Sequence, residues 1–103
     1  MVTIRYKIVI SSVFSDSAAE RAGLLPGDVI QLYDNVDVFS GDELRYATAA
    51  GTLGELVTMT IRRNGLNMDI FVERGPLGIH IAAAGSNPQN RSLALDVYLR
   101  HAL

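Results

Sequence analysis

The residues with the clearest chemical potential lie in residues 74–81, which read Arg-Gly-Pro-Leu-Gly-Ile-His-Ile. Two glycines and a proline predict a tight turn, because these residues adopt unusual backbone angles at low cost. The β-branched residues that follow predict a strand. A glycine turn that opens into a strand can direct several backbone N–H groups at one point, which makes an anion-binding site. The segment is therefore a candidate site for a carboxylate.

Two interpretations of this segment stay open on these residues alone. It is an ordinary corner between a loop and a strand, as most such turns are. Alternatively, the edge of the strand is a template for an extended peptide, and the turn holds the free carboxylate of that peptide. The elements around the segment must decide between the two.

Other chemistry finds little support in the sequence. The chain has no cysteine and two histidines, His80 and His101, without carboxylates at zinc-ligand spacing. It carries no phosphate-binding glycine motif and no motif around a nucleophilic serine. We therefore expect no enzyme, no catalytic residues, no metal and no cofactor.

Composition limits the class of protein further. The chain has 103 residues, 49% of them hydrophobic, which is enough for one domain with a core. Its net charge is −2 and it has no basic run, so we expect no nucleic-acid or anionic-membrane partner. No apolar run approaches the ~18 residues of a membrane span, and no signal peptide is visible. We expect a cytoplasmic location if the chain is complete, and a periplasmic one is open if it is a fragment.

The first half of the chain predicts two strands and a short helix. A strand is expected from Thr3 to Val13. Residues 17–20, Ser-Ala-Ala-Glu, form a capping box that starts a helix, and Gly23 ends it. After a turn at residues 26–28, the next strand runs from Val29 to Tyr33, and residues 36–39 are short and extended.

The second half predicts a longer helix and a hairpin. A second capping box at residues 40–43 starts a helix that stops at Gly51. Residues 56–63 alternate apolar and polar side chains, as does the return strand, and Asn64-Gly65 between them is a preferred hairpin turn. The last strand covers residues 79–83. We assign residues 1–85 to the domain and residues 86–103 to a linker and a helical tail from residue 91.

Residues 17–30, Ser-Ala-Ala-Glu-Arg-Ala-Gly-Leu-Leu-Pro-Gly-Asp-Val-Ile, resemble the signature of PDZ domains. The helix up to Gly51 and the strand after it fit the same family, and the resemblance covers about residues 6 to 83. It implies a small α+β fold, a five- to six-stranded, partly open β-barrel or sandwich capped by two helices. Here a C-terminal helical extension would be added.

The resemblance departs from the common animal arrangement in one respect. There, a Gly-Leu-Gly-Phe loop and its strand precede the signature, whereas the matching residues here are Pro76-Leu77-Gly78-Ile79, at the other end. The chain therefore resembles a circularly permuted PDZ domain of the bacterial type. Permutation leaves a site intact when the two termini lie close together.

The resemblance implies that a peptide C-terminus adds as a strand between residues 79–81 and the helix that contains Leu44. The N–H groups of Leu77, Gly78 and Ile79 would bind the carboxylate, with Arg74 supplying a positive charge. The alternative for Arg74 is a solvated surface charge. Pro76 has no N–H and would stiffen the loop.

Alternation along the strand would direct Leu77, Ile79 and Ile81 into a pocket for the last ligand side chain. From the helix, Leu44, Ala47 and Thr48 would close that pocket, and an alanine there favours a bulky apolar residue. The alternative for Leu44 is plain core packing. At the helix start the family's specificity position matches Ser40 or Gly41, so an apolar or undemanding residue is expected two positions before the ligand's end.

Three functions remain open at this stage. The first is a module that binds apolar peptide C-termini. The second is a regulatory or substrate-presenting domain of a bacterial protease. The third is self-association, in which a tail formed by residues 91–103 and ending in Leu103 fills the groove of a second copy.

Overall fold

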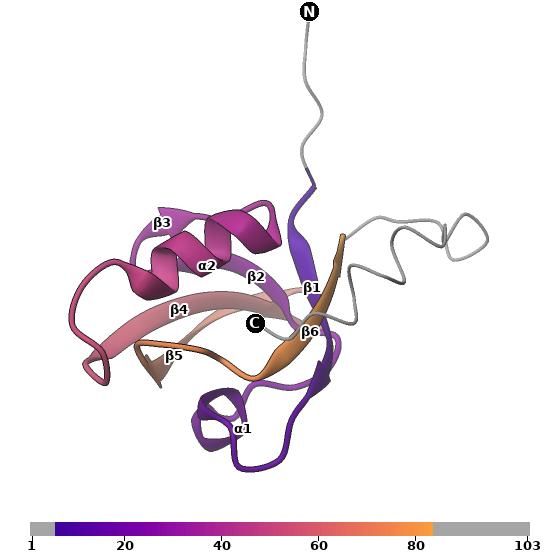
Figure 1. Ribbon diagram of the computed structural model, residues 1–103. Helices are drawn as coiled ribbons and strands as arrows, with labels where there is room; N and C mark the ends of the chain where they lie inside the picture. The colour runs from indigo at the N-terminus through magenta and orange to yellow at the C-terminus, as the bar shows by residue number, and fades with distance from the viewer. Residues whose placement is uncertain (1–5, 84–103) are drawn as a thin grey trace, which may run out of the picture.

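The computed structural model describes residues 6–83, which form one sheet and two helices (Figure 1). The predicted tail at residues 86–103, including its helix and its role in self-association, lies outside the described residues. The elements in chain order are β1 (Ile8–Val13), α1 (Ala18–Ala22), β2 (Val29–Tyr33), β3 (Val36–Asp37), α2 (Gly41–Ala49), β4 (Leu56–Arg63), β5 (Leu66–Glu73) and β6 (Ile79–Ala83).

The six strands form an open antiparallel sheet in the order β5-β4-β2-β1-β6, and β3 pairs with β2 outside this path. Figure 1 shows the strands lying between the two helices, with α2 above and α1 below in this view. The predicted α+β fold is confirmed for the described residues. The strands form one open sheet with two edges, β5 and β6.

Helix α1 begins as its capping box predicts. The Ser17 side chain accepts from the N–H of Glu20 at 3.1 Å. The Glu20 carboxylate reaches one residue further back than expected, to the N–H of Asp16 at 3.0 Å. Gly23 ends the helix with φ +87°, a left-handed conformation that glycine adopts without strain.

Helix α2 is capped in the same way, by Ser40, whose hydroxyl accepts from the N–H of Glu43 at 3.1 Å. Leu44 and Ala47 are buried against the sheet, three residues apart on one face of the helix. The chain leaves the helix through Gly51, at φ +114°. The helix face that carries Leu44 and Ala47 is therefore covered by the sheet, and the opposite face of α2 is exposed.

The predicted hairpin is confirmed residue by residue. Strand β4 pairs with β5 from Leu56 opposite Glu73 to Arg63 opposite Leu66. Asn64 and Gly65 both have positive φ, at +52° and +78°, as a type I′ turn requires.

Apolar side chains from all layers meet in one core. Its largest fully buried members are Tyr33, Ile10, Leu24, Ile30, Leu44, Met59, Ile61, Leu77, Ile79, Ile81, Val38 and Val72. Burial of apolar surface is the main favourable contribution to folding, at about 25 cal/mol per Å². The core therefore holds α2, the loop before β6 and β6 itself in fixed positions.

One buried carboxylate anchors the turn before β2. Asp28 is 1% exposed and receives two bonds from Arg63, from Nε at 2.8 Å and from a terminal nitrogen at 2.7 Å. It also accepts from the N–H of Leu25 at 2.8 Å. A bidentate pair of this kind fixes geometry, and its bond to Asp28 raises the pKa of Arg63. The pair ties β4 to the turn.

Candidate functional site

The loop between β5 and β6, residues 74–78, is bonded to α1 and to the residue that follows β1. The carbonyl of Leu77 accepts from the N–H of Ala19 at 2.9 Å, and the carbonyl of Gly78 accepts from the N–H of Phe14 at 2.9 Å. Gly78 has φ +80°, and a Cβ there would lie 2.4 Å from the Cβ of Ser17. Only glycine fits this position without displacement.

The same bonds decide where the N–H groups of the loop point. Val13 is paired with Ile79, and the bond from Phe14 to Gly78 flanks this pair. Because bonding groups alternate sides along an antiparallel strand, the N–H and C=O of Ile79 face the free edge of β6. Among the backbone bonds described for the loops of residues 6–83, none is donated by Leu77 or Gly78. The three amides predicted to bind a carboxylate therefore have no partner within the described chain.

The side chains of β6 alternate as predicted. Ile79 and Ile81 are fully buried on one side. His80 lies on the other side and is partly buried, with its Nδ1 3.1 Å from the Ser12 hydroxyl. Its ring packs edge-on against the Phe14 ring, with the two ring centroids 4.7 Å apart. His80 thus contributes to the packing of β6 on β1.

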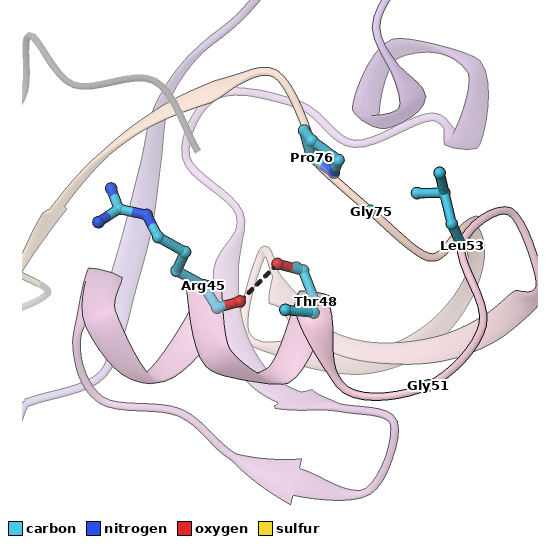
Figure 2. Close-up of a pocket in the computed structure, with 7 residues that line it drawn as sticks. Arg45, Thr48, Gly51, Leu53, Gly75 and Pro76 are labelled. Atoms are coloured by element: carbon cyan, nitrogen blue, oxygen red, sulfur yellow. Dashed lines mark hydrogen bonds between the residues drawn. The ribbon is translucent and has the colours of Figure 1, made fainter.

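A pocket of about 330 Å³ lies between the C-terminal half of α2 and the loop, as Figure 2 shows. The side chains of Arg45 and Thr48 project from the same side of α2. Thr48 points toward Pro76, and the Arg45 guanidinium extends away from Gly75 and Pro76, toward the start of the helix. The described residues that line the pocket are Arg45, Thr48, Ala49, Gly51, Leu53, Gly75 and Pro76. Leu53 is 77% exposed, so an apolar surface at the pocket is left uncovered.

The pocket is built from different residues than the sequence indicated. Of the expected wall residues, Thr48 lines it. Five others are buried in the core instead, and these are Leu44, Ala47, Leu77, Ile79 and Ile81. Ser40 caps the opposite end of α2. The alternative of core packing therefore describes Leu44, because the face of α2 that carries Leu44 and Ala47 is pressed on the sheet.

Arg45 is the charged pocket residue that the sequence analysis did not predict. It lies three residues before Thr48, so the two share a helix face. The three-residue spacing could have predicted Arg45 as a pocket residue. That prediction also requires knowing that the helix face of Thr48 lines the pocket. Leu53 and Gly75 carried no such signal, because they meet only through folding: a Cβ on Gly75 would lie 2.7 Å from the Leu53 side chain.

Arg74 is a buried structural residue, at 4% exposed. Its Nε donates to Glu55 at 2.5 Å, one terminal nitrogen donates to the carbonyl of Ala47 at 2.6 Å, and the other pairs with Asp34. Burial alone would lower the pKa of Arg74, but its bonds to Glu55 and Asp34 outweigh that effect and raise it. The alternative of a solvated surface charge is wrong, and the donors expected to face a ligand carboxylate are occupied within the domain.

Tyr33 lies beneath this arginine. Its ring is 5.6 Å from the Arg74 guanidinium carbon, and its hydroxyl is buried without a hydrogen bond of acceptable geometry. Burial raises the pKa of Tyr33, while the nearby backbone of Gly75 and the charge of Arg74 lower it without cancelling the rise. Tyr33 thus packs against Arg74, the first residue of the loop.

Within residues 6–83, no three His, Cys, Asp or Glu side chains cluster as metal ligands would. The helices of that same part of the chain are too short and too polar to cross a membrane.

The sequence model of the PDZ domain matches residues 9–63. This chain belongs to the PDZ domain family. A PDZ domain is a non-catalytic interaction module, so the described fold is one that binds other proteins.

Two curated relatives of this PDZ domain are proteases. The chain is 35% identical over 95 residues to a probable periplasmic serine endoprotease DegP-like from Hahella chejuensis, covering 86% of this chain and 20% of that protein. It is 33% identical over 85 residues to a protein of the same name from Marinomonas sp., covering 81% of this chain and 18% of the relative. The chain thus spans about a fifth of the length of these relatives.

Solved structures agree with the fold. The PDZ domain of an SdrC-like protein from Listeria monocytogenes superposes with a TM-score of 0.66 at 18% identity, covering 79% of this chain and 93% of that one. An HtrA-type protease solved with a decapeptide superposes with a TM-score of 0.60 at 29% identity, covering 78% of this chain and 23% of that one.

Proposed function

We propose that this PDZ domain binds the C-terminus of a peptide or protein whose last side chain is apolar. The ligand adds as a strand at the free edge of β6, beside α2. The N–H groups of Leu77, Gly78 and Ile79 bind its carboxylate, and its last side chain enters the pocket between α2 and the loop.

One observation carries this proposal, the orientation of the backbone around Ile79. Its N–H and C=O face the open edge of the sheet, and the preceding two amides have no partner in the described chain. Unpaired backbone groups on an edge strand are what strand addition requires.

The pocket supports the preference for an apolar last residue. Its volume of about 330 Å³ exceeds that of any single side chain, and Ala49, Leu53 and Pro76 give it apolar walls. The HtrA-type protease with a bound decapeptide adds support from a related protein.

We also infer that the domain is circularly permuted. The loop and edge strand that would receive the ligand follow the PDZ signature in this chain, whereas in the common arrangement they precede it. The antiparallel pairing of β6 with β1 agrees with that interpretation.

A peptide titration tests the binding mode. A short peptide that ends in Val-Ala-Leu as the free acid is added to the isotope-labelled chain, and the amide signals of Leu77, Gly78 and Ile79 are followed by NMR. We expect these three signals to shift with the free acid and to stay in place with the C-terminal amide, because the amide lacks the carboxylate charge.

A matched pair of variants controls for location. Thr48→Trp fills the pocket and should weaken binding at least tenfold, whereas Leu66→Trp adds the same bulk at the far hairpin, where residue 66 is exposed. Equal binding of the acid and amide peptides, or equal loss in both variants, would contradict the proposal.

A second candidate follows from the two DegP-like relatives: a domain that presents substrates to, or regulates, a periplasmic serine protease. The partner would then be an exposed C-terminus of a misfolded or cleaved protein. Sequencing the DNA on both sides of this coding segment tests it. An open reading frame that continues into a serine protease domain supports this role, and one without such a domain removes it.

A further inference from the structure

Arg45 is a positive charge at the wall of the proposed groove. Of the described residues that line the 330 Å³ pocket, it is the only charged one. It also lines a neighbouring pocket of about 440 Å³ further toward the start of α2, with Asp42, Tyr46 and Ala49. Figure 2 shows its side chain on the same face of α2 as Thr48, extending toward the start of the helix.

The guanidinium of Arg45 is available to a ligand. Its side chain is 60% exposed, and within the described part of the chain its ion pair is a weak one with Asp42, at 3.6 Å, which is itself 83% exposed. An exposed pair of this kind contributes little stability, because water screens both charges. The five donors of a guanidinium also allow Arg45 to bind a second carboxylate.

The direction of the ligand follows from the position of the loop. The loop precedes β6, so a ligand whose carboxylate lies at the loop must run antiparallel to β6. The C-terminal end of α2 lies at the same loop, because Arg74 bonds to the carbonyl of Ala47. Residues before the ligand's end therefore pass toward the start of α2.

The spacing then brings one ligand side chain to Arg45. In a strand, side chains on the same face are about 6.6 Å apart, because each residue rises about 3.3 Å. On a helix, four residues span about 6 Å. If the last side chain of the ligand lies beside Ala49, the ligand side chain two positions earlier lies beside Arg45.

We infer that Arg45 makes this groove select an acidic residue two positions before the C-terminus of its ligand. The inference rests on the proposed function and names its ligand class: a C-terminus of the form acidic, any, apolar. A carboxylate there forms a charge-assisted hydrogen bond with the guanidinium. This replaces the expectation of an undemanding residue, which considered only the helix start at Ser40 or Gly41.

Three peptides test the inference. They end in Asp-Ala-Leu, Asn-Ala-Leu and Lys-Ala-Leu, all as free acids, and their binding to the chain is measured by titration. At about 0.05 M salt we expect the Asp peptide to bind about three- to tenfold tighter than the Asn peptide, which has the same shape without the charge. The difference should shrink at about 0.5 M salt, because surface charges are then screened.

Variants assign the effect to one side chain. Arg45→Gln should make the Asp and Asn peptides bind equally, and Arg45→Glu should make the Lys peptide the tightest. Asp42→Asn should widen the preference for Asp, since it removes the carboxylate that competes for Arg45. Arg62→Gln is the matched control, because it removes one exposed positive charge from β4 and lines neither pocket.

The outcomes separate this inference from the proposed function. If the free acids bind, the amides do not, and Asp and Asn bind alike, selection by Arg45 is wrong while recognition of the C-terminus stands. If Arg62→Gln removes the preference as well as Arg45→Gln does, the effect is one of net charge and the inference fails. If no free-acid peptide binds, the inference falls together with the proposed function.

Discussion

Two arginines flank the loop that would receive the ligand, and their surroundings are opposite. Arg74, at the start of the loop, is almost completely buried and has three partners within the domain. Arg45, across the pocket on α2, is mostly exposed and has one weak ion-pair partner among residues 6–83. The same residue type is thus structural at position 74 and a candidate ligand contact at position 45. The difference in burial explains the two roles.

The comparison shows why charge near a binding motif does not identify a ligand contact. Arg74 is adjacent in sequence to the glycine turn, but a buried guanidinium must have its donors satisfied within the protein. Arg45 is about thirty residues away in sequence and reaches the groove because α2 presents that face to the loop. Four substitutions test this contrast.

Replacing Arg74 should have the largest effect. Arg74→Ala removes three bonds that join the turn after β2, helix α2 and the segment before β4 to the loop, so we expect the free energy of unfolding to fall by about 3 kcal/mol. Urea unfolding followed by circular dichroism measures this. A loss no larger than that of Arg45→Ala would mean that burial does not distinguish the two arginines.

Gly78→Ala should come next. At φ +80° an alanine is strained, and its Cβ would meet the Ser17 side chain. We expect a loss of about 2 kcal/mol in the free energy of unfolding and weaker binding of the free-acid peptide. Gly65→Ala, with similar φ at the open hairpin turn and nothing within 4 Å of its Cβ, is the control that carries strain alone. Equal losses in stability and binding for both variants would argue against close packing at the loop.

Tyr33→Phe tests the support beneath Arg74. Because the raised pKa of Tyr33 favours its neutral form in the folded state, its contribution is complete below about pH 10 and is lost as the pH rises through the folded pKa. We expect Tyr33→Phe to change the free energy of unfolding by about 1 kcal/mol or less at pH 7 and to flatten its decline above about pH 10. Unfolding curves at several alkaline pH values measure this, and an unchanged decline would show that other groups cause it.

Arg45→Ala should have the smallest effect on stability. Alanine favours the helix and the exposed pair with Asp42 contributes little, so we expect a change of about 0.5 kcal/mol or less. Thermal unfolding of the variant beside the parent chain measures it. A much larger loss would mean that Arg45 is also structural, and the contrast with Arg74 would disappear.

Local patterns in the sequence were sufficient for most of the fold. The capping serines at positions 17 and 40, the Asn64-Gly65 turn and the alternation along β4 all gave the correct element, because each depends on a few adjacent residues. The signature at residues 17–30 led to the correct family for the same reason.

The composition of the candidate site required the tertiary structure. The sequence alone predicted a glycine turn before an edge strand, and the three amides of Leu77, Gly78 and Ile79 stay a prediction for the carboxylate site. It did not predict that Leu44 and Ala47 pack against the sheet or that Arg74 is enclosed by Asp34 and Glu55. Nor did it predict that Arg45 lines the pocket. Those facts depend on which face of α2 packs inward and on carboxylates that folding brings close. Short-range sequence patterns therefore predict the backbone conformation of the site. Which side chains surround it depends on packing between residues that are far apart in the sequence.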